Sequence, residues 1–161
     1  MDRSVYNLSS IVVLAEAEGR RMLLTGDARG DDILQALLEA KLRSEERPFQ
    51  VDVLKLPHHG SDRNVDQEFF DSIRALHYVI SANGKDTNPD VPTLEMISRS
   101  RTDDDFTVWL TNAPSDFEVE GVGKEVAGFF AEETAKGRRY RVVYRDPDEL
   151  SVRIELPGVP A

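Results

Sequence analysis

The sequence predicts an α/β domain in which a mixed sheet is flanked by helices. Short apolar runs alternate along the chain with longer segments whose apolar residues have the spacing of amphipathic helices. The chain has 161 residues, of which 40% are hydrophobic and 31% are charged. This length and composition suit a single globular domain over residues 1–161 with a buried core.

The first elements are predicted to be a hairpin and a helix. Residues 10–15 and 21–25 are apolar runs typical of strands, and residues 17–20 between them form a turn in which Gly19 can adopt a positive φ. Residues 31–42 have the apolar spacing of one helix face. The hairpin therefore leads into the first layer of helix.

The rest of the chain continues the alternation. Pro57 ends one apolar run, and Pro92 is well placed in the first turn of a helix. In order, we expect a strand over 51–56, a helix over 67–76, a strand over 78–81, a turn-rich loop over 83–92, a helix from Pro92 to about Arg101, a strand over 106–111, an irregular segment over 112–123, a helix over 124–136, and strands over 140–145 and 150–156 joined by a turn at 146–149.

Composition excludes several classes of function. The chain has no cysteine, so any metal would be held by His, Asp, Asn or water, which suits zinc, manganese or iron. No apolar run approaches the roughly 20 residues that span a bilayer, and the first residues do not resemble a secretion signal, so a cytoplasmic location is expected. The net charge of −10 disfavours general polyanion binding, which leaves nucleic acid as a partner only through a metal site.

Two apolar runs end in side chains that can bind a metal. The first ends at Gly26-Asp27, and the second is followed by Pro57-His58-His59-Gly60-Ser61. Adjacent histidines on an extended backbone point in opposite directions, so only one of them faces a given site unless the turn at Gly60 redirects the other. Asp27, His58 and His59 are therefore the candidate catalytic residues and metal ligands, although Asp27 could instead cap the following helix.

Other polar residues are weaker candidates. Asn7 could bind a metal through its side-chain oxygen or cap a turn before the first strand. Asn83, Lys85 and Asn88 lie in the turn-rich loop, where they could bind a polar substrate or only line a solvated turn. His77, at the start of a predicted strand, is interpreted as structural.

Taken in order, four segments of the chain resemble the metallo-β-lactamase superfamily, above all the hydrolase-like domain of bacterial DNA-uptake (competence) channel proteins. The segments are residues 7–14, 23–27, 51–61 and 79–83. The resemblance implies that Asp27 bridges two metal ions and that one of His58 and His59 is a late ligand. Asn7 falls where many members have a ligand histidine. Such enzymes use two metals, often zinc or manganese, to hydrolyse esters, amides or phosphodiesters, and phosphodiester hydrolysis is the reaction we prefer.

The chain also departs from the family. The His-x-His-x-Asp-His cluster that supplies most ligands is missing, because the three histidines of the chain, His58, His59 and His77, do not have that spacing. The resemblance therefore covers the C-terminal half of an αββα sandwich, as a fragment, a split half or a degenerate domain. Half of the sandwich leaves an apolar sheet face open, so we expect a missing N-terminal half or a homodimer as partner, and weak or absent metal binding and activity in this chain alone. The alternative is a non-catalytic structural or interaction domain that keeps the fold.

Overall fold

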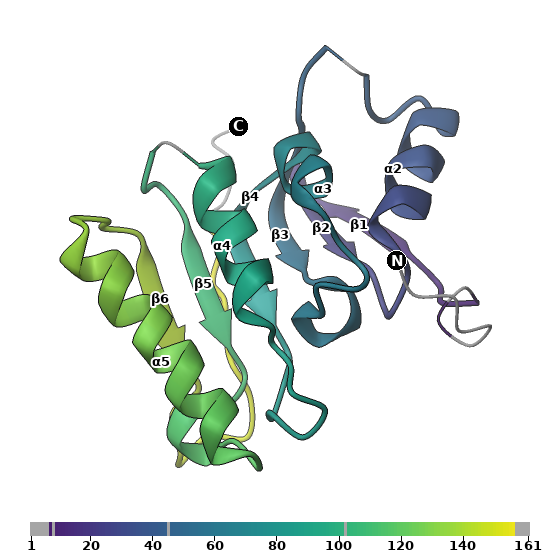
Figure 1. Cartoon of the computed structure of the whole chain (residues 1–161). Coiled ribbons are helices and arrows are strands. Elements are labelled where there is room, and N and C mark those ends of the chain that lie inside the picture. Colours follow the sequence, from purple (N-terminus) through teal and green to yellow (C-terminus); the bar gives the residue numbers. More distant parts are fainter. Residues whose placement is uncertain (1–6, 8, 45, 102, 157–161) are drawn as a thin grey trace.

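The six strands form one sheet in which each strand pairs with its neighbours in the sequence (Figure 1). This computed structural model describes residues 7, 9–44, 46–101 and 103–156. The elements are β1 (Val13–Ala17), β2 (Arg20–Leu24), α2 (Gly30–Glu39), β3 (Phe49–Lys55), α3 (Gln67–Ser72), β4 (Ile73–Ile80), α4 (Val91–Ser100), β5 (Thr107–Leu110), α5 (Glu120–Ala135) and β6 (Arg141–Tyr144), with 3₁₀ turns at Pro57–Gly60 and Pro114–Asp116. The predicted α/β class with a mixed sheet is confirmed.

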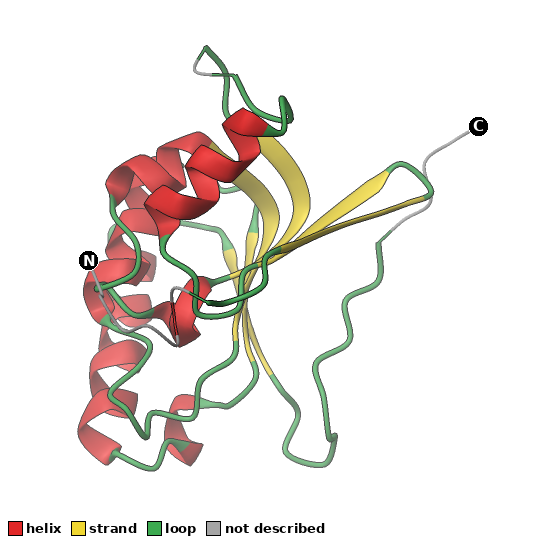
Figure 2. Ribbon diagram, turned by 90° about the vertical axis from the view of Figure 1, so that its right-hand side faces the viewer, coloured by secondary structure: helices red, strands yellow, loops and turns green. Residues whose placement is uncertain are grey.

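The order of the strands explains why the helices lie on one side. β1 and β2 are antiparallel, joined by a two-residue turn in which Glu18 and Gly19 both have positive φ, the geometry that a tight hairpin requires. Every later neighbour pair is parallel. Right-handed crossovers that always advance in the same direction place all their helices on one face, as Figure 2 shows.

The covered face of the sheet holds the core. Leu23, Leu54, Tyr78 and Val108 occupy one row across β2 to β5, and none is more than 2% exposed. The helices pack onto this row through buried aliphatic and aromatic side chains, which include Ile33, Leu37, Phe69, Leu94, Ile97 and Val126. Among the described residues, no helix is both long and apolar enough to cross a membrane.

The opposite face of the sheet carries no helix (Figure 2). The next row across the strands is Leu24, Lys55, Val79, Trp109 and Val143. Leu24 is 37% exposed, and its neighbours on the same face, Val13 and Met22, are similarly accessible. We call this surface the open face. The exposed apolar side chains on it lie on β1 and β2.

The predicted strand over 150–156 does not join the sheet. Arg145 donates to the carbonyls of Thr111 and Glu149, and the turn at Asp146 closes with a bond from the Glu149 amide, so the chain leaves β6 at this point. The segment then runs along the side of the open face (Figure 2), where half-buried residues alternate with exposed ones. Apolar and polar residues alternate over 150–156 as in a strand, but the turn directs the segment away from the sheet edge.

Two predicted boundaries were also wrong. The helix expected over 67–76 ends at Ser72, because Ile73 pairs with Phe49 and the next residues, although good helix formers, are drawn into the sheet. The last helix begins at Glu120, four residues earlier than expected. A side chain at Gly123 would clash with the carbonyl oxygen of Pro114, so glycine is needed there for close packing and is not a helix breaker.

Candidate functional site

Asp27 lies in a tight turn that follows β2. Gly26 has a φ of 54°, and a Cβ at this position would meet the Ser10 side chain at 3.3 Å. The Asp27 amide donates to Ser10 Oγ at 3.1 Å, and the Thr25 hydroxyl donates to the Lys55 carbonyl at 2.6 Å. The turn is therefore held on both sides, while the Asp27 side chain remains 37% exposed at the carboxyl end of the sheet.

The two histidines lie in a left-handed turn that follows β3. His58, His59 and Gly60 have φ values of 44°, 60° and 85°. Left-handed backbone is uncommon for residues with a side chain and costs on the order of 1 kcal/mol or more at each. The His58 amide donates to the Gly26 carbonyl at 3.0 Å, which joins this turn to that of Asp27. The strained turn thus brings residues from the ends of two adjacent parallel strands together.

His59 is the histidine that faces Asp27. Its Nε2 lies 3.8 Å from Asp27 Oδ1, and its Nδ1 lies 2.5 Å from the Ser81 carbonyl oxygen. Because a carbonyl can only accept, the proton of a neutral ring sits on Nδ1 and the lone pair is on Nε2. A ring nitrogen that donates to a backbone carbonyl in this way is typical of metal-binding histidines.

His58 is held on the other side of the turn. Its Nδ1 is 2.7 Å from Oδ1 of Asn64, a fully buried residue whose Nδ2 donates to the Asp27 carbonyl at 3.0 Å. His58 and His59 also line different cavities. His59 is therefore the histidine that lies beside Asp27, which the sequence could not specify. Nothing in the sequence distinguished Asn64 from other polar loop residues.

The loop candidates surround His59. A small cavity of about 60 Å³ is lined by His59, Ala82, Asn83, Lys85, Asp86 and Asn88. Asn83 donates to Glu118 at 2.6 Å, which ties the start of the loop to the segment before α5. Asn88 is buried and donates to the His58 carbonyl at 3.3 Å, which ties the end of the loop to the histidine turn. The three residues predicted to bind substrate thus lie together beside the candidate ligand.

Lys55 is a neighbour of Asp27 that sequence reasoning missed. Its Nζ donates to the Gly26 carbonyl at 3.3 Å. Burial lowers the pKa of Lys55, and the negative charge of Asp27 partly offsets this effect. An ordinary strand lysine gives no signal in the sequence, because its closeness to Asp27 follows only from the parallel pairing of β2 with β3.

Asn7 lies in the turn that precedes β1. Its backbone carbonyl accepts a hydrogen bond from the Ser10 amide at 3.1 Å. Because the Ser10 hydroxyl in turn accepts from Asp27, the turn that contains Asn7 packs beside the Asp27 turn. A role for the Asn7 side chain as a metal ligand remains a prediction.

The donor set is incomplete for a catalytic metal. Within the described part of the chain, no group of three or more histidine and acidic side chains could hold a metal ion. Asp27 and His59 supply two ligands, whereas a catalytic zinc normally has three from the protein. This pair alone is one donor short of such a site.

Comparison with known proteins gives one distant relative. No family model and no solved structure matches this chain. The chain is similar to ComE operon protein 3 of Bacillus subtilis (strain 168), with 29% identity over 114 residues. The match covers 66% of this chain and 14% of that protein, so the chain spans only a small part of its relative's length.

Proposed function

We propose that this chain supplies one wall of a metal-dependent hydrolase site of the metallo-β-lactamase type. The observation that carries the proposal is the pair formed by Asp27 and His59 at the ends of adjacent parallel strands, with the His59 ring oriented by the Ser81 carbonyl. The resemblance described above and the similarity to a segment of ComE operon protein 3 support it. Phosphodiester hydrolysis is the proposed reaction.

Each residue of the site has a proposed role. Asp27 and His59 act as ligands for zinc or manganese, and both side chains are accessible enough to bind an ion. His58 and Asn64 position the two turns. The loop with Asn83, which borders His59, shapes the entrance for substrate. The missing ligands must come from outside this pair.

The second wall is proposed to be a β-layer that packs on the open face. This face leads directly to the site, because Leu24 and Lys55 are the last residues of β2 and β3 on it, and the Asp27 and histidine turns follow them. Exposed Val13, Met22 and Leu24 would be buried by such a layer. A layer packed there would place metal ligands of its own close to Asp27.

Zinc titration of the purified chain, followed by calorimetry, tests the ligand assignment. Asp27→Ala and His59→Ala should each weaken zinc binding by about tenfold or more, because each removes one of two donors. The matched control is His58→Gln, which should lose stability and should lose less zinc affinity than His59→Ala, because His58 is held by Asn64 and acts only through the position of the turn. Equal losses of zinc affinity in the His58 and His59 variants would contradict the assignment.

A second function of a different class is a non-catalytic interaction domain. The observation that favours it is the combination of an incomplete donor set with an accessible apolar face. Under this alternative, the chain binds neither zinc nor manganese, and Asp27→Ala changes nothing but local stability. Light scattering of the same sample reports whether the open face is covered by a second copy or requires a different chain.

A further inference from the structure

The amino ends of β2, β3 and β4 gather arginines, far from the carboxyl ends that carry Asp27 and His59. A cavity of about 520 Å³ and an adjoining one of about 360 Å³ share Arg21 and Gln50. We call them the arginine cavities. Six arginines line them: Arg20, Arg21, Arg43, Arg47, Arg74 and Arg101. Only two acidic residues, Glu16 and Asp52, are among their lining residues, although the chain as a whole carries a net charge of −10.

The larger cavity opens where the β3–β4 ladder is irregular. In the core cluster, β3 contributes Val51 and then Leu54, and β4 contributes Ala75 and then Tyr78, so cluster members are three residues apart where the alternation of a regular strand places them two apart. Asp52 lies at this break and has no partner in the register of the two strands. Val51, Asp52, Ala75 and Leu76 line the larger cavity at this break.

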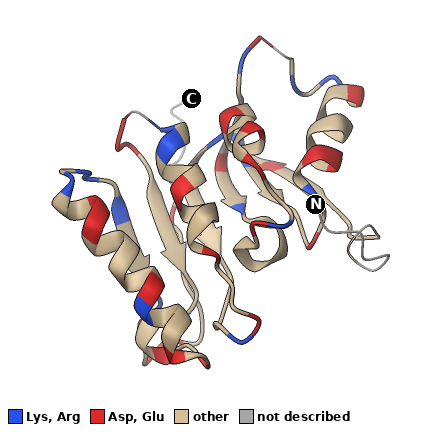
Figure 3. Cartoon of the chain, viewed as in Figure 1, with Lys and Arg blue, Asp and Glu red and all other residues tan. Residues whose placement is uncertain are grey.

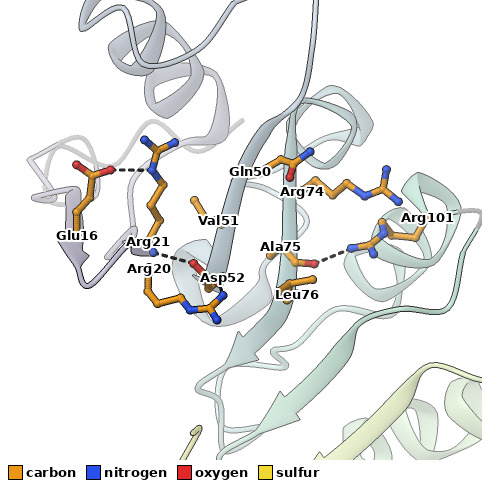
Figure 4. A pocket seen from close by; sticks show the side chains of 11 residues that line it. Glu16, Arg20, Arg21, Gln50, Val51, Asp52, Arg74, Ala75, Leu76 and Arg101 are labelled. Atoms are coloured by element: carbon orange, nitrogen blue, oxygen red, sulfur yellow. Dashed lines mark hydrogen bonds and ion pairs between the residues drawn. The ribbon is translucent and has the colours of Figure 1, made fainter. Parts of the chain in front are cut away.

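Some of the arginines have structural roles. Asp52 accepts from Arg20 Nη1 and from the Arg21 amide, each at 2.8 Å. The Arg101 side chain is 3% exposed and donates to Asp103, to the Ala75 carbonyl and to the Asp105 carbonyl. Figure 4 shows Arg20 and Arg21 on one side of the cavity and Arg74 and Arg101 on the other. The buried members thus hold the walls of the cavity in place.

Other arginines are available to a ligand. The side chains of Arg21 and Arg74 are 45% and 42% exposed, and each is paired with an exposed carboxylate, Glu16 or Asp103. Such surface ion pairs contribute little stability and exchange readily for a better anion. In the smaller cavity, Nε of Arg43 is buried without a hydrogen-bond partner within the described part of the chain. The exposed guanidinium groups can therefore turn toward an incoming anion at little cost.

We propose that the arginine cavities bind a ligand that carries two or more phosphate groups. Guanidinium groups bind phosphate through paired, charge-assisted hydrogen bonds, and arginine is preferred over lysine for this geometry. Arginines that line two adjoining cavities suit a row of phosphates better than a single ion. Figure 3 shows basic residues in the segment that follows α2 and leads to this edge of the sheet. The site is separate from the proposed hydrolase site and does not depend on it.

Calorimetry with inorganic tripolyphosphate, in metal-free buffer at low salt, tests the proposal. Arg21→Gln and Arg74→Gln should each weaken binding about three- to tenfold, because each removes one charge-assisted contact. Arg99→Gln is the matched control. It removes the same charge from an exposed arginine that pairs with Glu95 outside both cavities. Binding should also weaken as salt is raised.

Two further titrations identify the kind of molecule that supplies the phosphate groups. ATP and a short thymidine oligonucleotide are titrated in the same way, and binding of either supports the proposal and names the kind of ligand. Asp27→Ala with His59→Ala should leave tripolyphosphate binding unchanged, which separates this proposal from the hydrolase site. The proposal is overturned if none of the three probes binds, if Arg99→Gln weakens binding as much as Arg21→Gln, or if the Asp27 and His59 substitutions abolish it.

Discussion

The two faces of the sheet are built from the same strands, yet they have different surroundings. Leu23 and Leu24 are adjacent on β2, but Leu23 is fully buried under the helices and Leu24 is 37% exposed on the open face. The difference arises because every parallel crossover advances in one direction, so all helices cover the same side. The core of this chain therefore lies on one face, and the other face carries exposed apolar side chains on β1 and β2, with the candidate site at its edge.

The largest expected effect comes from substituting each of the two leucines by alanine, which compares the covered face with the open face. Leu23→Ala should lower the free energy of unfolding by about 2–5 kcal/mol, because it leaves a cavity in the core. Leu24→Ala should cost less than about 1 kcal/mol, since its side chain is already in contact with solvent. Urea unfolding of both variants measures the difference. Equal losses would mean that the open face contributes as much to folding as the covered one.

A second prediction concerns the boundary between the faces, where Asn64 connects the two turns. Asn64→Ala should cost about 1–3 kcal/mol, because it removes the hydrogen bonds of the buried Asn64 side chain to His58 Nδ1 and to the Asp27 carbonyl. It should also weaken zinc binding by about 10- to 100-fold through loss of positioning. Thermal unfolding and zinc titration report the two effects. Asn83→Ala, at an exposed loop asparagine, serves as control and should cost less in stability.

A third prediction uses pH to probe the open face. Burial lowers the pKa of His77 below its ordinary value of 6.5; Asp52 opposes this shift and Arg141 adds to it. Trp109 Nε1 donates to His77 Nδ1 at 3.1 Å, so the folded protein holds this ring neutral. The associated stability is complete above pH 6.5 and is lost as the pH falls below it, because the unfolded chain then binds the proton more readily.

The His77 contribution should amount to less than about 1 kcal/mol, because the residue is partly solvated. Unfolding by urea between pH 8 and pH 5 measures it. His77→Gln should flatten the decline over this interval. A decline of the same slope in the variant would assign the pH dependence to other groups.

The smallest expected effect comes from placing a charge on the open face. Leu24→Lys should change stability by about 0.5 kcal/mol or less, because the side chain can extend into solvent. It should reduce the fluorescence of a bound apolar dye, since it interrupts the row of exposed apolar residues. Leu42→Lys is the matched control, because Leu42 is 42% exposed but lies outside the sheet. The same loss of dye binding in both variants would show that the open face is not a distinct apolar surface.

Much of the architecture could be predicted from local sequence. The hairpin turn at Gly19, the strand that ends before Pro57 and the helix opened by Pro92 all lie close to where the sequence predicts them. Each has a local cause: the positive φ of Gly19, the missing amide hydrogen of a proline, or the regular spacing of apolar residues. The helix expected to run to Leu76 was wrong because pairing of Ile73 with Phe49, a contact distant in sequence, overrides helix propensity.

For the candidate site, too, some features follow from the sequence and others only from the tertiary structure. The sequence by itself determined that Asp27, His58 and His59 follow two apolar strands, because the pattern of apolar and polar residues specifies where a strand ends. Only the tertiary structure decided that His59 faces Asp27, because three consecutive left-handed residues aim the two rings to different sides. The arginine cavities are likewise a product of tertiary structure. Their residues come from segments far apart in the chain, which the parallel pairing of β2, β3 and β4 places side by side.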